Sequence, residues 1–291
     1  DPPVLPPPAL APAQPAEDEP EAEPDEDAAA RWHPPHWAAD VRAETSGDAP
    51  DLSGVLTDLD RELARLEDDY VAVRYDQIDS LVTQVEAAVE ADDLAALAAI
   101  TLAPSLHGSG AVERALLALA TTASERATDE VAGDVVLDPD EVADEVDSMS
   151  ELPSVASAVA ASVAAHLALS AADEALRLYS PGVTGSEVAS RVRKFLDGLK
   201  GAERAAAFGA ALHRATNVGR GAAFTVALRE KPGGKATAFE NNDLRTCQPC
   251  NSINGHTFAS VEEALATYGA GGYPYCLGGR RCRGTWYPVW S

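Results

Sequence analysis

The sequence predicts a mostly α-helical protein with a small α+β C-terminal domain clipped by four cysteines, preceded by a disordered, acidic, proline-rich N-terminal tail. Three observations lead to this prediction. Alanine is abundant and aromatic residues make up only 5% of the 291 residues, which favours helices over a β-sandwich. Prolines and acidic residues crowd the first fifty positions. All four cysteines lie after residue 246.

The predicted tail spans residues 1–50. Five prolines in the first eight residues cannot donate backbone hydrogen bonds to a helix or a sheet. The run from Glu17 to Asp27 has too little apolar surface to offset the entropy cost of ordering the chain. Trp32 and Trp37 stand out here, with two histidines beside them. We interpret the tryptophans as a docking peptide for a partner groove; packing on the following helix and metal binding by the histidines are the alternatives.

Residues 51–229 are predicted to be helical. From Leu52 onward, apolar residues recur at spacings of three and four, which is typical of a helix. Such a helix is either a coiled-coil arm or a core-facing helix of a bundle. The longest uncharged run, Leu152 to Ala172, is rich in alanine, so we expect a buried helix rather than a membrane span. The apolar stripe consists of Leu52, Val55, Leu59, Leu63, Leu66, Tyr70 and Val73, and continues through Ile78, Leu81, Val85 and Val89.

Capping signals divide this region into further helices. Asp138 precedes Pro139, which predicts a helix start with an N-cap and a proline in the first turn. Thr184 and Glu187 form a predicted capping box. The next predicted helix runs from Ala202 to Leu228 and is stopped by the Pro-Gly-Gly sequence that follows it, with glycines at 219 and 221 as candidate kinks.

Residues 230–291 read as a small α+β segment. Strands are expected at Ala236–Phe239 and Thr285–Trp290. A hairpin is expected over Ile253–Phe258, because its Asn254-Gly255 pair is typical of a type I′ turn. Ser260, followed by a glutamate three residues later, predicts a short helix.

The four cysteines, Cys247, Cys250, Cys276 and Cys282, form the clearest chemical pattern. The first two make a C-x-x-C pair on a predicted tight turn, a spacing suited to two ligands of a tetrahedral zinc ion. We therefore expect a structural zinc site, with His256 as a possible substitute ligand. Disulfides and a thioredoxin-like redox motif are the alternatives. In each leading case the cysteines clip together a segment too poor in apolar residues to form a core alone.

Several short motifs follow one another in the C-terminal part of the chain: D-x-R-x-C-x-x-C from Asp243 to Cys250, then Asn254-Gly255 before an aromatic residue, then a Tyr-Pro-x-Cys and a Cys-Arg. This order resembles the C-terminal domain of MuF-like minor head proteins of tailed bacteriophages, also called head morphogenesis proteins. The resemblance covers residues 185–288, about a third of the chain. This chain departs from the family pattern at three places. The family usually has Asp at the position of Asn254 and His at the position of Tyr273. It often has a single residue between its last two cysteines, whereas five residues separate Cys276 from Cys282. The residues that carry the resemblance are Arg214, Thr216, Asn217, Gly219, Arg220, Asp243, Arg245, Cys247, Cys250, Asn254, Gly255, Phe258, Tyr273, Pro274, Cys276, Cys282 and Arg283.

This resemblance implies a structural role. It implies a minor capsid component that acts in capsid assembly or DNA packaging and delivery near the portal. Its partners would be the portal protein or the major capsid protein, with self-association through helices. Its location would be the capsid interior or portal vertex of the virion, after assembly in the host cytoplasm. The four cysteines and Asp243 are the site residues that the resemblance carries over.

Charge and missing motifs narrow the functional classes. The net charge of -25 disfavours general nucleic-acid binding and anionic membranes, so we expect no membrane partner. The sequence has no G-x-S-x-G, H-E-x-x-H or phosphate-binding loop motif, and we therefore expect no enzymatic activity. The alternative function is a zinc-ribbon nucleic-acid-binding module on an acidic helical body, because three arginines at 280, 281 and 283 surround Cys282.

Overall fold

The computed structural model of the chain describes residues 53–131, 137–149, 151–240, 246–268, 272–277 and 284–290. All of them belong to one unit, Trp37–Ser291. The predicted tail with Trp32 and Trp37 lies outside the described residues. Asp243, Arg245 and Cys282 lie outside them as well, so the predictions for these five residues stay predictions.

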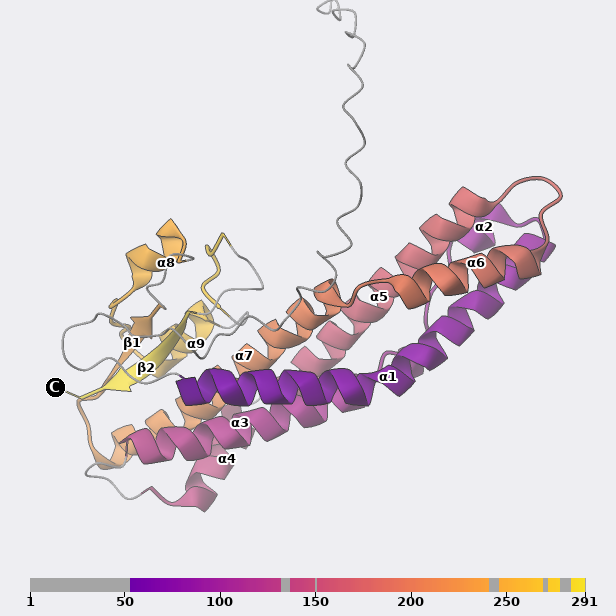
Figure 1. Cartoon of the computed structure of the whole chain (residues 1–291). Coiled ribbons are helices and arrows are strands. Elements are labelled where there is room, and N and C mark those ends of the chain that lie inside the picture. Colours follow the sequence, from indigo (N-terminus) through magenta and orange to yellow (C-terminus); the bar gives the residue numbers. More distant parts are fainter. Residues whose placement is uncertain are drawn as a thin grey trace, which may run out of the picture. The chain divides into compact units, whose positions relative to one another are not determined.

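Helices make up most of the described chain and a short antiparallel sheet follows them, which confirms the predicted fold class (Figure 1). Two short strands and two short helices form the C-terminal region and lie beside the C-terminal end of the last long helix (Figure 1). The helical elements are α1 (Ser53–Glu90), α2 (Leu94–Ala98), the 3-10 turn η2 (Pro104–Leu106), α3 (Ser109–Val131), α4 (Pro139–Met149), α5 (Leu152–Leu178), α6 (Gly185–Gly198) and α7 (Ala202–Glu230). The C-terminal elements are β1 (Lys235–Phe239), α8 (Gln248–Ile253), α9 (Val261–Thr267) and β2 (Thr285–Val289).

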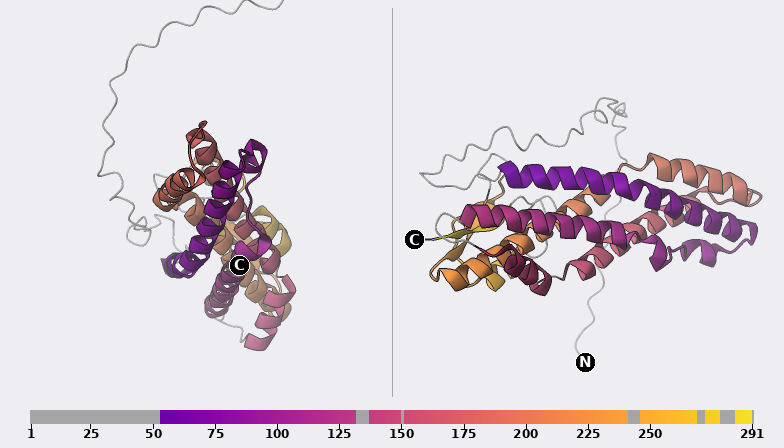
Figure 2. Two further views of the ribbon diagram at one scale, coloured as in Figure 1. Left: turned by 90° about the vertical axis from the view of Figure 1, so that its right-hand side faces the viewer. Right: turned by 90° about the horizontal axis from the view of Figure 1, so that it is seen from below.

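One core lies where α1, α3, α5 and α7 pack against each other, and Figure 2 shows α1 and α3 running side by side. Tyr70 of α1 packs edge-on against Phe208 of α7, with ring centroids 5.0 Å apart. The Tyr70 hydroxyl donates to the carbonyl oxygen of His107, and Gln77 donates to the carbonyl oxygen of Leu106. These bonds hold the segment between α2 and α3 against the middle of α1.

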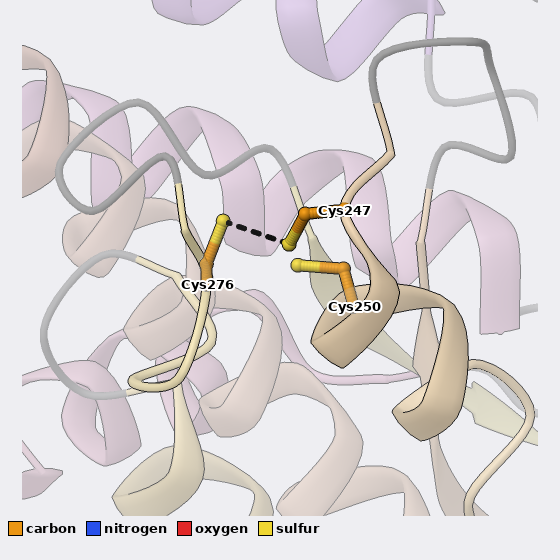
Figure 3. Close-up of side chains that lie close together, drawn as sticks. All are labelled: Cys247, Cys250 and Cys276. Carbon is orange, nitrogen blue, oxygen red and sulfur yellow. Dashed lines mark hydrogen bonds between the residues drawn. The ribbon is translucent and has the colours of Figure 1, made fainter.

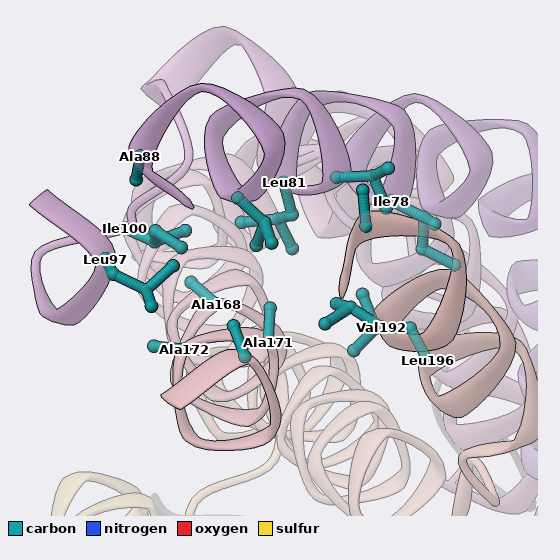
Figure 4. Packing of buried hydrophobic residues seen from close by; sticks show 14 of the residues in the cluster. Ile78, Leu81, Ala88, Leu97, Ile100, Ala168, Ala171, Ala172, Val192 and Leu196 are labelled. Carbon is teal, nitrogen blue, oxygen red and sulfur yellow. The ribbon is translucent and has the colours of Figure 1, made fainter. Parts of the chain in front are cut away.

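A second core joins the last turns of α1 to α2, α5 and α6 (Figure 4). Leu81 of α1, Ala171 of α5 and Val192 of α6 are all completely buried in it. The apolar stripe of α1 therefore faces protein along its length, which confirms the core-facing interpretation over the coiled-coil arm.

Helix α5 contributes small residues to both cores. It buries an alanine at every third or fourth position, from Ala156 to Ala175, so that neighbouring helices approach it closely. Among the described residues it is also the one helix that is long and apolar enough to cross a membrane by length and composition alone. In this structure its alanine face packs against α3, α6 and α7, while the opposite face is open and leaves Leu169 63% exposed, so the helix is buried on one side only.

The predicted caps are confirmed. Helix α4 starts at Pro139, where the amide of Asp140 donates to the Asp138 carboxylate. Thr184 and Glu187 form the capping box of α6. The glycine at 219 serves a close helix approach, because a Cβ there would overlap the carbonyl oxygen of Ala120 on α3.

The C-terminal sheet differs in part from the sequence-based prediction. Strands β1 and β2 pair antiparallel, with Ala238 opposite Trp286, as expected for the two strand segments. The hairpin prediction for Ile253–Phe258 is wrong, because Ile253 ends helix α8. Asn254 has φ of -56° and Gly255 has φ of 79°, so only one residue of the turn is left-handed and a type I′ turn is excluded.

Candidate metal centre

Three of the four cysteines meet in the C-terminal region. The Sγ atoms of Cys247, Cys250 and Cys276 all lie within 4.8 Å of one another. The Sγ atoms of Cys247 and Cys276 are 3.8 Å apart, and the three side chains point toward a common centre (Figure 3). All three are free thiols, so these cysteines form no disulfide with one another. Three convergent thiols are compatible with a site for a thiophilic metal ion.

The first two thiols are held by the start of α8. Cys247 is its N-cap residue and Cys250 lies in its first turn, where Pro249 fits because its missing N–H needs no partner. The C-x-x-C pair thus sits on a helix N-terminus and not on the tight turn that we expected. Cys276 comes from a separate turn in which its amide donates to the carbonyl oxygen of Tyr273. Two segments far apart in sequence therefore supply the thiols.

The environment of Cys247 favours a thiolate. Desolvation raises its pKa, but the backbone N–H groups of Cys250 and Leu277 and the neighbouring thiols outweigh desolvation and lower the pKa to about 7. The Leu277 amide lies 3.4 Å from the Cys247 sulfur. Metal ligation requires deprotonated cysteine, so this arrangement prepares the site for a cation.

A buried carboxyl group adjoins the thiols. Glu240 is 2% exposed, and its side chain is hydrogen-bonded to Cys250 and Tyr268. Burial raises its pKa to about 7, although both hydrogen bonds oppose this. No role for Glu240 was predicted from the sequence, because it is one of 47 acidic residues. Its position directly after the predicted strand is the one feature of the sequence that could have indicated it.

Two residues that carry the resemblance, Asn254 and Gly255, hold the turn next to the site in place. The Asn254 side chain accepts a hydrogen bond of 2.9 Å from the backbone amide of Glu240. Gly255 donates through its amide to the carbonyl oxygen of Ala238, with the left-handed backbone that glycine favours. Both residues therefore fix the end of α8 to β1 and lie beside the thiols rather than among them.

The structure does not bring His256 into the thiol cluster. Its side chain is exposed, and its ring packs edge-on against Phe258 with centroids 5.0 Å apart. Within the described ranges, the group of possible ligands contains the three cysteines alone. The fourth predicted thiol, Cys282, lies outside those ranges.

Aromatic side chains line the region under the site. Phe258, Tyr268, Tyr273 and Tyr275 follow one another at centroid distances of 6.2, 6.2 and 5.5 Å. Phe258 and Tyr268 are buried, whereas Tyr275 at the other end of the series is 72% exposed. The cysteine turn is thus attached to the small C-terminal core by ring packing as well as by its thiol contacts.

The C-terminal region is joined to the helical body by a buried polar contact. Arg220 of α7 is 1% exposed and donates to the Thr285 hydroxyl and to the Trp286 carbonyl oxygen of β2. The same hydroxyl donates to the Asn217 side chain at 2.7 Å. Two residues that carry the resemblance, Asn217 and Arg220, thus meet strand β2 at this junction.

Comparisons with known proteins leave the family open. The chain matches no protein-family model, no curated protein and no solved structure. The resemblance to MuF-like head proteins therefore depends on the residues quoted from the sequence and enters the argument as a proposal.

Proposed function

We propose that Cys247, Cys250, Cys276 and Cys282 hold a structural zinc ion. The observation that carries this proposal is the spacing of the thiols. A tetrahedral zinc ion with Zn–S bonds of about 2.3 Å keeps its sulfur ligands about 3.8 Å apart. The Cys247 and Cys276 sulfurs are 3.8 Å apart, whereas a disulfide requires about 2.05 Å.

Two contacts of described residues support Cys282 as the fourth ligand. Leu277 lies against the Cys247 sulfur through its amide. Gly284 lies against the Glu240 carboxyl group, which itself contacts Cys250. Of the two described residues that bracket positions 278–283, Leu277 therefore contacts a thiol and Gly284 contacts the carboxyl group beside the thiols, as the proposal for Cys282 requires.

The small size of the C-terminal core supports a structural role for this zinc. Few buried residues form this core, and one of them, Phe224, belongs to helix α7 of the helical body. Zinc bound by four thiolates has no open coordination position for a substrate, so it serves to hold the α8 turn and the Cys276 turn together.

Native mass spectrometry of the full chain tests the zinc proposal. We expect the wild-type mass to exceed the sequence mass by one zinc ion, and Cys247→Ser and Cys276→Ser to lose that ion. His256→Ala is the matched control and should keep it, because the ring lies outside the thiol group. A wild-type mass lower by two or four hydrogens, without metal, would establish disulfides and contradict the proposal.

We further propose that the protein is a non-enzymatic minor head protein of a tailed bacteriophage, acting in capsid assembly or DNA packaging and delivery near the portal. The MuF-like motif supports this role. The bracing functions of Asn254 and Gly255 add support, because the aspartate usual in the family would accept the same hydrogen bond as Asn254. The proposed partners are the portal protein and the major capsid protein, and the proposed location is the virion.

Co-assembly tests the head-protein proposal. The chain is co-expressed with the portal and coat proteins of a tailed phage that encodes it, and heads are purified by sedimentation. We expect the chain in the heads, and a reduced amount for Trp32→Ala/Trp37→Ala. Tyr75→Ala is the matched aromatic control, because Tyr75 is 60% exposed on α1. A chain that stays at the top of the gradient while heads form would overturn the proposal.

The second candidate function is a zinc-ribbon nucleic-acid-binding module. One observation favours it: Tyr275 is exposed beside Cys276, with its ring 5.5 Å from Tyr273, as needed for stacking on a base. Titration of the full chain with single-stranded DNA at low and high salt tests it. Binding at low salt that Tyr275→Ala weakens would support this function, and no binding at low salt would exclude it.

A further inference from the structure

A groove lies on the outer side of the bundle where the end of α5 meets α6. It is a wide, open surface depression with a volume of about 640 Å³. It is remote in sequence from the cysteine residues, and none of its lining residues belongs to the metal centre. The groove is lined by Glu174, Arg177, Leu178, Tyr179, Ser180, Arg191, Lys194 and Phe195.

The helical period of α6 explains why cations line this groove. Val192 and Leu196 point into the core (Figure 4), and both are completely buried. The remaining side chains of the same turns, Arg191, Lys194 and Phe195, are therefore exposed on the outer face. Residues three and four apart are neighbours on a helix surface, so the two cations and the ring form one continuous patch.

Two of the three cations in the groove are outside the ion pairs formed by the described residues. Arg177 is fully engaged, because it makes two hydrogen bonds of 2.7 and 2.6 Å to the Glu174 carboxylate. Arg191 and Lys194 make no hydrogen bond or ion pair with any residue that the structure describes. By contrast, Arg193 on the opposite side of α6 pairs with Asp79 at 2.6 Å. The groove thus carries two cations that form no ion pair of their own, with Glu174 and Glu187 near Arg191, on a chain whose net charge is -25.

The groove also offers apolar surface. Phe195 is 36% exposed, and Leu178 and Tyr179 are partly buried beside it. The Tyr179 hydroxyl is tied to the Asp92 carboxylate, so its ring has a fixed place in the groove wall. A ligand that fits this groove therefore combines negative groups with apolar ones.

We propose that the groove binds an acidic linear peptide segment of a partner protein. Carboxylates of the peptide pair with Arg191 and Lys194, and an apolar side chain lies on Phe195. In an extended peptide, residues two apart are about 6.6 Å apart, close to the 5–6 Å that separates side chains three apart on a helix. This proposal is independent of the zinc site and goes beyond the proposed head function.

The charges around the patch favour a peptide over a nucleic acid. Arg191 lies near two carboxylates, those of Glu174 and Glu187. The pKa of Glu174 is lowered mainly by its hydrogen bonds to Arg177, and the pKa of Glu187 mainly by its hydrogen bonds to Thr184. The charge of Arg191 lowers both pKa values further. The positively charged patch formed by Arg191 and Lys194 is therefore short, and carboxylates lie at its edge. It matches a ligand with two or three negative groups, whereas a nucleic acid needs a longer positive track.

Fluorescence polarisation with a defined probe tests the proposal. The probe is a fluorescein-labelled eight-residue peptide of four glutamates and four leucines, and the matched probe has glutamine in place of glutamate. We expect saturable binding of the acidic peptide to the full chain. Arg191→Ala/Lys194→Ala should raise the Kd at least about tenfold, since two charge-assisted contacts are lost. Arg114→Ala/Lys200→Ala removes two exposed cations elsewhere and should leave the Kd within about twofold.

Each other outcome would overturn the proposal. Equal loss in both double variants would show general charge attraction, and equal binding of the glutamine probe would show apolar binding. Tighter binding of an eight-nucleotide single strand than of the peptide would show a nucleic-acid site. Circular dichroism of both variants checks that they are folded, and Arg191→Lys should retain most of the binding if charge at this position is what matters.

Discussion

The Tyr268 hydroxyl donates a hydrogen bond of 2.9 Å to the Oε1 atom of Glu240, and both side chains are buried. This pair links α9 to the end of β1 directly under the thiol cluster. A buried carboxyl group with neutral partners is most stable in its protonated form, so Glu240 makes the C-terminal region sensitive to pH near neutrality.

The first prediction concerns how the free energy of unfolding of the metal-free protein depends on pH. The Glu240 pKa rises from 4.5 in the unfolded chain to about 7 in the folded protein. Between these values only the folded state keeps the proton, so the free energy of unfolding falls as pH rises, by up to about 3 kcal/mol. Urea unfolding on both sides of this interval measures it. Glu240→Gln should abolish the fall and the exposed control Glu203→Gln should keep it; an unchanged fall in Glu240→Gln would contradict the assignment.

The second prediction concerns two glycines of α7. A methyl group at Gly219 would overlap the carbonyl oxygen of Ala120, so Gly219→Ala must push α3 and α7 apart. We expect a loss of about 3 kcal/mol in the free energy of unfolding. Gly209→Ala in the same helix is the control: its nearest neighbour is a Leu63 methyl group 4.0 Å away, and we expect a gain of about 0.5 kcal/mol. Similar changes for both variants in urea unfolding would refute the close approach.

The third prediction compares ion pairs whose carboxylate is buried with an ion pair whose carboxylate is exposed. Asp58 is 6% exposed and pairs with Arg61 and Arg126, whereas Asp79 is well exposed and pairs with Arg193. Asp58→Ala should cost about 2 kcal/mol, because it removes charge-assisted hydrogen bonds to a buried carboxylate, while the side chains of Arg61 and Arg126 stay in contact with solvent. Asp79→Ala should cost less than about 1 kcal/mol. Thermal unfolding of both variants measures the difference, and equal costs would show that burial does not set the strength of these pairs.

The fourth prediction tests which face of α5 is in the core. Ala171 is completely buried between α1, α2 and α6 residues, while Ala165 is exposed. Ala171→Leu should destabilise the protein by about 2 kcal/mol through overpacking. Ala165→Leu adds the same atoms outside the core and should change stability by less than about 0.5 kcal/mol. The opposite order of the two values in urea unfolding would place the other face of α5 in the core.

Local signals made most of the helical fold predictable. Asp138 and Thr184 each bond to backbone amides within three residues, so their caps depend on neighbouring sequence alone. The stripe from Val55 to Val89 has the helical period because one face of α1 meets protein throughout. The hairpin over Ile253–Phe258 was mispredicted for a corresponding reason: Asn254 and Gly255 bond to β1, a segment that their own sequence does not specify.

The sequence by itself determined the helical class of the protein, several helix starts and the identity of the thiols, because periodicity, caps and cysteine spacing act over a few residues. Only the tertiary structure decided that Cys276 meets the C-x-x-C pair, that Glu240 is buried beside them, and that Arg191 and Lys194 share a groove with the end of α5. These outcomes depend on contacts between distant segments. Such contacts are set by how the cores pack, and packing is a property of the whole chain.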